Sequence, residues 1–219
     1  MPGMANAVKR ASGRADRRER ARATRLRMMR AAYELFCERG YAGTTMADVA
    51  ERAGVAVQTV YFTFHTKRDL LSGSYDLAVM GEADPLPPDV QPWYLAAAAE
   101  PGLGEAIRLI VEGIGEIERR TTPLDTVVRA AAQADPDSAA VWQRHEQLRH
   151  DGFERMLVDV LLPKASLRDH LDAERATVLL LMLLGHGVYQ ALVLDYGWSH
   201  EAWADWVARA IEELFVEGT

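Results

Sequence analysis

Residues 44–67 read TTMADVAERAGVAVQTVYFTFHTK, and this stretch decides the fold that we expect for the N-terminal part of the chain. Thr45 and Asp48 have the spacing of a capping box, in which two side chains bind the free amides at a helix start. Gly54 follows the apolar face of that helix and can supply the positive φ of a sharp exit. The stretch therefore predicts two short helices joined by a tight turn, with a third helix starting at its end.

Two short helices around a glycine-containing turn are typical of the helix-turn-helix, whose second helix enters the major groove of DNA. An ordinary helical hairpin has the same pattern, so this stretch alone leaves both interpretations open. The rest of the chain has to decide between them.

Charge is distributed unevenly along the chain. The 219 residues carry a net charge of −7, which by itself argues against binding to nucleic acid. However, residues 1–80 hold fourteen Lys and Arg against eight Asp and Glu, a balance of +6, whereas residues 81–219 hold eleven against 24, a balance of −13. This asymmetry is expected when one end of a protein faces phosphates and the other faces solvent, a small molecule or a protein.

The composition, 49% hydrophobic and 26% charged, is typical of a soluble globular protein. Cys37 is the only cysteine, so an intramolecular disulfide is excluded, and a cytoplasmic location is expected. Cys37 lies on an apolar stripe of a helix predicted over 24–39, where we expect a buried thiol. Residues 176–194 are apolar over almost the length of a membrane span, but a buried helix over 173–196 explains this segment better.

Residues 22–81 resemble the DNA-binding domain of the tetracycline-repressor (TetR) family of transcriptional regulators. The matching segments are AAYELFCERGY (31–41), TTMADVAERAGV (44–55) and VQTVYFTFHTKRDLL (57–71). Two residues depart from the family pattern, because Thr63 stands where the family usually has His and Gln58 stands where a small residue is common. Both lie in or beside the recognition helix, so they bear on which DNA sequence is read.

No strand alternation is visible, and we expect an all-α chain with an N-terminal three-helix helix-turn-helix domain and a larger helical ligand-binding and dimerisation domain. Two separate helices are predicted around 107–117 and 124–131. The expected divisions are a flexible basic arm (1–20), a TetR-type DNA-binding domain with its motif at about 45–64 (21–81), a Pro-rich connection (82–103), and a helical regulatory and dimerisation domain (104–219).

The candidate DNA-binding residues belong to the motif and its flanks. We assign base reading to Gln58 and Thr59, because an amide can pair with adenine and a Thr methyl can contact thymine. Phosphate contacts are assigned to Tyr61, Lys67 and Thr44, while an exposed lysine without a role remains the alternative for Lys67. The full set is Thr44, Thr45, Gln58, Thr59, Tyr61, Phe62, His65 and Lys67.

The resemblance also implies a homodimer that reads a roughly palindromic operator and a small-molecule pocket whose occupation releases DNA. The dimer would be a four-helix bundle through Leu180, Leu184, Leu192, Trp203, Val207 and Ile211, unless these residues simply fill the core of the monomer. Candidate pocket residues are Trp93, Tyr94, Trp142, His145, Phe153, Met156, His186 and Tyr189, each of which can also be an ordinary core residue.

No arrangement of residues typical of an enzyme, a metal site or a cofactor site is found, so we expect no catalytic residues, metal or cofactor. The preferred interpretation is a homodimeric repressor that a small, largely apolar ligand releases from its operator. An α-helical ligand-binding or adaptor protein, whose N-terminal helices contact protein instead of DNA, is the alternative. We expect no membrane partner.

Overall fold

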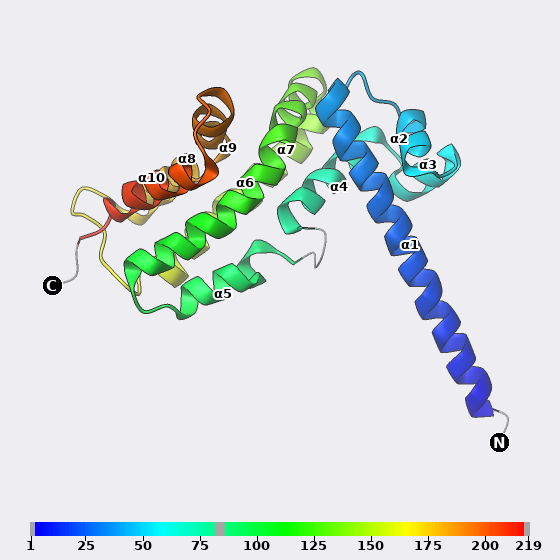
Figure 1. Cartoon of the computed structure of the whole chain (residues 1–219), viewed down its shortest axis with the longest axis horizontal. Coiled ribbons are helices and arrows are strands. Elements are labelled where there is room, and N and C mark those ends of the chain that lie inside the picture. The colour runs from blue at the N-terminus through cyan, green and yellow to red at the C-terminus, as the bar shows by residue number, and fades with distance from the viewer. Residues whose placement is uncertain (1–2, 82–85, 217–219) are drawn as a thin grey trace. The chain divides into compact units, whose positions relative to one another are not determined.

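The computed structural model describes residues 3–81 and 86–216, with side chains described from residue 16 onward apart from that of Val141 (Figure 1). The regular elements in these ranges are all helices, and one isolated antiparallel bridge joins Leu167 and Phe215. The prediction of an all-α fold is confirmed.

The chain divides into two compact units, Met1–Ser74 and Tyr75–Thr219, which we call the N-terminal unit and the C-terminal unit. The division falls inside helix α4 (Lys67–Met80), whereas we expected it in the Pro-rich connection. Residues 82–85 of that connection lie outside the described residues. The connection also contains more helix than expected, namely a short 3₁₀ helix η1 (Pro88–Val90) and helix α5 (Pro92–Ala99). Each starts with a proline at a position where no amide hydrogen is needed.

The N-terminal unit contains α1 (Gly3–Arg39), α2 (Met46–Ala53), α3 (Val57–Phe64) and the first half of α4. The capping box that starts α2 is confirmed, because the amide of Asp48 donates to Thr45 Oγ1 at 3.1 Å and the amide of Thr45 donates to Asp48 Oδ2 at 2.8 Å. Thr66 and Asp69 make the same reciprocal pair at the start of α4.

Two backbone turns set the directions of α3 and α4. Gly54 has φ 65° and ψ 44°, and the amide of Val55 donates to Ala50 O while that of Gly54 donates to Glu51 O, which is the Schellman pattern. His65, at φ 53° and ψ −51°, is the centre of a γ-turn in which the Thr66 amide donates to Phe64 O. A non-glycine residue in this region of φ and ψ carries backbone strain.

Helix α1 is longer than expected and presents a different face. We expected a flexible arm over residues 1–20, but α1 begins at Gly3, and residues 1–2 lie outside the described residues. Ala and Arg, which favour helix, are the most frequent residues of this stretch. The prediction of a buried Cys37 is wrong, since Cys37 is exposed. The buried stripe runs instead through Met28, Ala31, Ala32, Leu35 and Phe36, one position away from Cys37.

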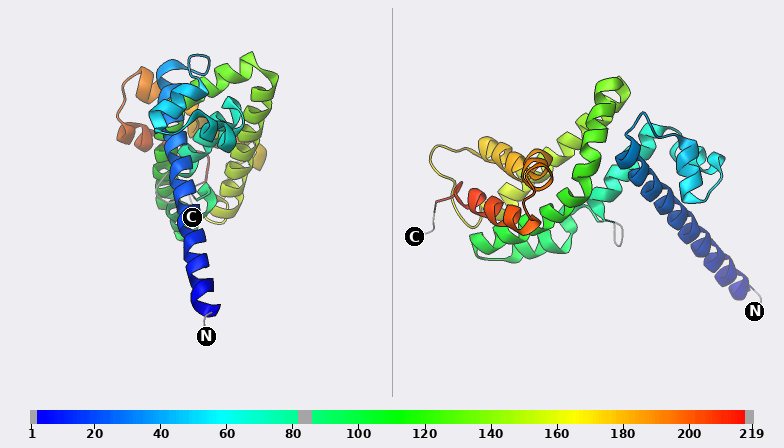
Figure 2. Two further views of the ribbon diagram at one scale, coloured as in Figure 1. Left: turned by 90° about the vertical axis from the view of Figure 1, so that its right-hand side faces the viewer. Right: turned by 45° about the horizontal axis from the view of Figure 1, so that its top comes forward.

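The C-terminal unit is built around α6 (Leu103–Ala134), which contacts α5, α7 (Pro136–Arg155), α9 (His186–Tyr189) and α10 (His200–Glu212) (Figures 1 and 2). A π-helical segment, η2 (Met156–Leu161), continues α7. We expected two helices within the range of α6, but a single helix continues through Pro123. Leu124, Val127 and Val128 are buried on the same helix, so packing against neighbouring helices offsets the cost of the interior proline.

The single helix expected over 173–196 is broken. Helix α8 (Ala173–Leu183) ends at Leu184, α9 starts after Gly185, and a second π-helical segment, η3 (Gln190–Asp195), follows. A Cβ on Gly185 would lie 2.4 Å from Leu181 O, so the chain can turn here only with glycine. By length and composition, Ala173–Asp195 is the one segment among the described residues that could cross a membrane. Here, however, Leu180 and Leu184 of this segment are buried in the core of the C-terminal unit.

The residues predicted for a dimer interface lie mainly inside the C-terminal unit. Leu180, Leu184, Trp203, Val207 and Ile211 are almost completely inaccessible, and only Leu192 is half-buried. The interface prediction is therefore wrong for these five residues, because α8 and α10 pack against each other and α10 packs on α6. The alternative, that these residues fill the monomer's own core, is the one that the structure supports.

The turn after α2 leads to a test of local stability. Gly54→Ala places a Cβ where no atom lies within 4 Å, so its cost is the left-handed conformation alone, about 1 kcal/mol. We expect a lower thermal midpoint by circular dichroism. The matched control is Gly152→Ala inside α7, which also has no atom within 4 Å and which we expect to raise the midpoint. Equal stability of Gly54→Ala and wild type would contradict the role of this turn.

Candidate nucleic-acid interface and ligand cavity

Helix α3 presents an exposed polar and aromatic face. Val60 and Phe64 are buried against the rest of the N-terminal unit, and they lie four residues apart on one side of the helix. On the opposite side Gln58 is exposed, Tyr61 is half-exposed and Phe62 is 84% exposed. Tyr61 and Phe62 thus place two neighbouring aromatic rings in water, and adjoining exposed apolar side chains are typical of a surface that a partner covers.

Several predicted DNA contacts lie beside this face. Thr45 and His65 are exposed at the start of α2 and the end of α3, and Thr59 is half-buried. The Thr63 hydroxyl donates to Thr59 O at 2.8 Å, so it is engaged within the helix. Gln58, Tyr61, Phe62, His65 and Thr45 are therefore the predicted residues whose side chains are accessible on this part of the unit.

Thr44 does not belong to the accessible set. It is completely buried, and its hydroxyl lies 3.1 Å from Leu35 O and 3.0 Å from Gly40 O, where it caps the end of α1. The prediction of a phosphate contact for its side chain is wrong. The adjacent Thr45 starts α2 and is exposed, and a sequence pattern cannot show which of two neighbouring threonines turns inward.

Lys67 also has a structural role. Its ammonium donates to Tyr41 O at 2.8 Å and to Thr44 O at 3.0 Å, and it lies 4.2 Å from the centre of the Tyr41 ring. Burial lowers the pKa of Lys67. These contacts occupy the three directions of the ammonium hydrogens and tie the loop between α1 and α2 to the start of α4.

Basic side chains extend the accessible surface along α1. Figures 1 and 2 show α1 continuing well beyond α2 and α3. Arg25 lies with its guanidinium 4.4 Å from the centre of the Phe64 ring, which links α1 to α3. The N-cap of α3, Ala56, has no side chain that can bind the helix amides, and the amide of Thr59 donates to Ala56 O at 2.9 Å. The amides of Val57 and Gln58 have no partner among the described residues and can bind an anion. The arginines of α1 with exposed side chains are Arg17, Arg18, Arg20, Arg22, Arg25, Arg27 and Arg30.

The C-terminal unit contains a cavity of about 440 Å³, a size typical of small-molecule sites. Its walls come from the second half of α4, from η1 and α5, from α6 and α7, and from His186 at the start of α9. The indole N–H of Trp93 donates to Gln91 Oε1 at 2.9 Å, which helps to hold Trp93 in the cavity wall. The Trp93 ring also packs directly against Gly113. A Cβ on Gly113 would lie only 2.1 Å from the Trp93 ring, so this wall requires glycine in α6.

The cavity brings together most of the pocket residues that we predicted. Trp93, Tyr94, His145, Phe153, Met156 and His186 line it. Trp142 and Tyr189 do not line this cavity. Trp142 packs under the guanidinium of Arg129 at 4.9 Å, and Tyr189 is buried against Trp203 with its hydroxyl 3.1 Å from His200 Nδ1.

A buried polar cluster lies at one side of the cavity. His186 Nδ1 lies 2.5 Å from Glu118 Oε2, and His186 Nε2 lies 2.9 Å from the Tyr75 hydroxyl. All three side chains are at least nine-tenths buried. Burial, and then the negative charges of Asp125 and Glu118, raise the pKa of Tyr75, so its hydroxyl remains protonated at neutral pH. His186 is thus a hydrogen-bonded histidine that also faces the cavity.

Glu118 is the important cavity residue that sequence reasoning missed. The apolar face of α6 runs through Ile107, Val111 and Ile114, and the same helical spacing continues to Glu118 and Thr121. A charged residue that continues a buried stripe is a signal of a functional group, and it could have been read from the sequence. The contribution of α4, through Tyr75 and its neighbours, had no comparable signal.

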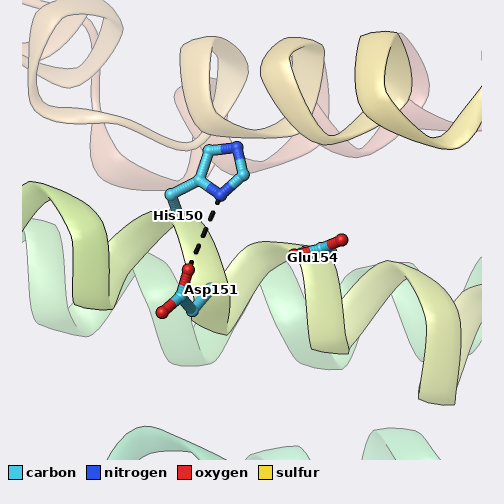
Figure 3. Close-up of side chains that lie close together, drawn as sticks. All are labelled: His150, Asp151 and Glu154. Atoms are coloured by element: carbon cyan, nitrogen blue, oxygen red, sulfur yellow. Dashed lines mark ion pairs between the residues drawn. The ribbon is translucent and has the colours of Figure 1, made fainter.

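One group of side chains in the described ranges has the composition of a metal site. His150, Asp151 and Glu154 lie on α7, with ligand atoms within 4.8 Å of one another (Figure 3). His150 Nδ1 and Asp151 Oδ1 are 3.8 Å apart, and both side chains are substantially exposed. A solvated group of this kind is common without an ion, and we assign no metal to it.

Comparison with known proteins agrees with this geometry. The family model of bacterial regulatory proteins of the tetR family matches residues 28–73, which include the whole of α2 and α3. The HTH-type transcriptional regulator TtgR of Pseudomonas putida is 28% identical over 174 residues, which are 74% of this chain and 76% of TtgR.

Solved structures share the fold of the whole chain. NalD, the secondary repressor of the MexAB-OprM multidrug efflux pump in Pseudomonas aeruginosa, aligns with a TM-score of 0.64 at 18% identity, over 90% of this chain and 98% of NalD. A protein of Saccharomonospora viridis described as a transcriptional regulator, solved in complex with choline, aligns with a TM-score of 0.64 at 18% identity, over 89% of this chain and 98% of its own. The matched family, its curated relatives and the capped helix-turn-helix show that this chain belongs to the tetR family of bacterial regulatory proteins and is a DNA-binding transcriptional regulator, not an enzyme.

Proposed function

We propose that this chain is a cytoplasmic homodimeric repressor, which a small, largely apolar ligand releases from a roughly palindromic operator. The observation that carries the proposal is the exposed face of α3, where Gln58, Tyr61 and Phe62 stand in water on a helix whose other side is firmly packed. An α-helix of this kind fits the major groove of DNA. The exposed arginines of α1 add contacts to phosphates that do not depend on sequence.

Base reading is assigned to α3, and chiefly to Gln58. Its amide is exposed near the start of the helix and can pair with the edge of an adenine. Thr59 contributes less, since it is half-buried, and we assign phosphate contacts to Tyr61 and Thr45, whose side chains are exposed. Phe62 and His65 extend the accessible face of the helix.

Release by a ligand is supported by the position of the cavity on α4. Tyr75, Val79 and Met80 of α4 line the cavity, and the first half of the same helix belongs to the N-terminal unit. A ligand that moves or stiffens α4 can change the DNA affinity of α3, provided that it binds the two states of the protein with different affinity. The choline complex of the S. viridis protein supports a small-molecule site in this fold.

The dimer surface that we propose is the outer face of α8 and η3, in place of the residues first predicted. Val178, Met182, Leu194 and Tyr196 are apolar or aromatic and each is at least half exposed. Val178 and Met182 lie four residues apart on one side of α8, opposite to the buried Leu180 and Leu184. Exposed apolar residues that gather on one face mark a surface for protein contact.

A mobility-shift experiment on DNA fragments from upstream of the chain's own gene tests DNA reading. Gln58→Ala should reduce the preference for the operator over unrelated DNA by about tenfold or more, since a bidentate base contact contributes about 1–3 kcal/mol of discrimination. The matched control is Gln143→Ala on α7, which is also exposed and should change nothing. If wild type bound no duplex even at low salt, the chain would act through protein contacts, as an adaptor, and DNA reading would be refuted.

Lys67→Met separates a structural from a phosphate-binding role. We expect lower thermal stability and weaker DNA binding, because the ties from Lys67 to Tyr41 O and Thr44 O are lost. The slope of log affinity against log salt should stay as in wild type. A slope smaller by about one unit would mean that Lys67 does neutralise a phosphate. Lys164→Met in the C-terminal unit is the control and should leave thermal stability, DNA affinity and the salt slope unchanged.

Sedimentation at micromolar concentration tests the dimer. Wild type should sediment at twice 24.3 kDa, and Met182→Glu should sediment as a monomer, because a charge would be buried without a partner in the interface. Leu95→Glu introduces the same charge at a similarly exposed apolar residue of α5 and should remain dimeric. A monomeric wild type would overturn the proposed dimer, and a dimeric Met182→Glu would move it to another face.

A further inference from the structure

One oxygen of the buried Glu118 carboxylate is left for a ligand. Glu118 Oε2 receives the hydrogen bonds of His186 Nδ1, at 2.5 Å, and of the Thr122 hydroxyl, at 3.1 Å. Oε1 has no hydrogen-bond or ion-pair partner among the described residues, and it is not sealed from the cavity that Glu118 lines. The side chain as a whole is only 4% exposed. A buried carboxylate with an unused oxygen requires a donor or a positive charge.

The two arginines that line the cavity, Arg149 and Arg155, already interact with acidic side chains. Arg155 lies 3.7 Å from Asp89, and Arg149 Nη2 donates to Glu146 Oε2 at 2.9 Å. The remaining nitrogens of Arg149, Nε and Nη1, have no partner among the side chains that the structure describes, which would suit an anionic ligand. Both are sealed from the cavity, however, and Nη1 is directed at Gly185, where a Cβ would lie 2.9 Å away. A ligand inside the cavity reaches Glu118 Oε1 and does not reach these two nitrogens.

The charges around the cavity also favour a cationic ligand over an anionic one. Asp76 and Asp89 line the cavity together with Glu118. Burial lowers the pKa of His145, so its imidazole adds no charge at neutral pH. Burial, and then the charge of Asp159, raise the pKa of Tyr94, while the charge of Arg155 opposes this shift. Aromatic residues also line the cavity, among them Trp93, Tyr94 and Phe153, and the face of an aromatic ring attracts cations.

We propose that the effector of this regulator is an organic cation, a protonated amine with a compact apolar body, whose ammonium group donates to Glu118 Oε1 while its body packs among Trp93, Tyr94 and Phe153. This assignment rests on the proposed function, in which the cavity holds the releasing ligand. A charge-assisted hydrogen bond to a carboxylate that is only 4% exposed is stronger than the bond of a neutral donor, so the charge of the ligand should decide its affinity.

Three probes of the same shape test the assignment by calorimetry on the full-length protein. 4-Phenylbutylamine is a cation, 4-phenyl-1-butanol is neutral and 4-phenylbutyrate is an anion. The amine should bind at least tenfold more tightly than the alcohol, and the butyrate should bind weakest. Failure of the amine to bind, or tighter binding of the alcohol or the butyrate, would overturn the proposal. This comparison uses wild type and depends on no variant.

Glu118→Gln identifies the group that recognises the charge. It keeps the size of the side chain and one oxygen acceptor, and it should weaken amine binding about tenfold or more while leaving the alcohol unchanged. The matched control is Glu112→Gln on the exposed side of α6, which should change neither affinity. Unchanged amine binding by folded Glu118→Gln, checked by circular dichroism, would contradict the role of Glu118.

Operator release, measured by mobility shift, distinguishes failure of the cation assignment from failure of the proposed ligand-driven release. If wild type binds operator DNA, and the amine binds the protein and releases that DNA, both proposals are supported. If the amine binds with the expected dependence on Glu118 but leaves DNA binding unchanged, the cation site stands and ligand-driven release fails. If DNA is released by the butyrate instead, release stands and the cation assignment fails.

Discussion

The buried carboxylate of Glu118 is the constraint around which the C-terminal unit is arranged. It lies on the inner face of α6, the helix that most others of this unit contact, and a charge there must be matched by hydrogen bonds. His186 supplies the main one, at 2.5 Å. His186 can do so because the chain breaks at Gly185 and restarts as α9, which brings the imidazole to α6.

The same imidazole links the cavity to α4. Its second nitrogen lies 2.9 Å from the hydroxyl of Tyr75, the first residue of the C-terminal unit. Tyr75 follows directly after Ser74, whose hydroxyl lies 3.2 Å from Met29 O of α1 in the N-terminal unit. Two neighbouring residues of one helix are therefore held by different units. In the proposed release mechanism, α4 is therefore the element through which occupation of the cavity would be communicated. The same contacts agree with a division of the chain inside α4 and not in the Pro-rich connection.

The N-terminal unit depends on a smaller set of internal ties. Thr44 and Lys67 were assigned to DNA from their place in the motif, yet both bind backbone carbonyl groups around the loop between α1 and α2. These contacts hold the loop from which α2 starts, so we expect their effect on DNA binding to be indirect. Of the two departures from the family pattern, Thr63 is engaged in its own helix, while Gln58 is free to meet a base. In the proposed function, specificity particular to this protein is therefore assigned to Gln58.

The sequence by itself determined the all-α class, the capped ends of α2 and α4, the turn at Gly54 and the basic character of the N-terminal region. These depend on residues close together in the chain, so spacing and charge are enough to predict them. The tertiary structure alone decided which side chains face inward. Leu180 and Trp203 became core instead of interface, Cys37 became exposed, and Glu118 joined the cavity, because burial depends on the elements that pack against each face, and these come from distant parts of the chain.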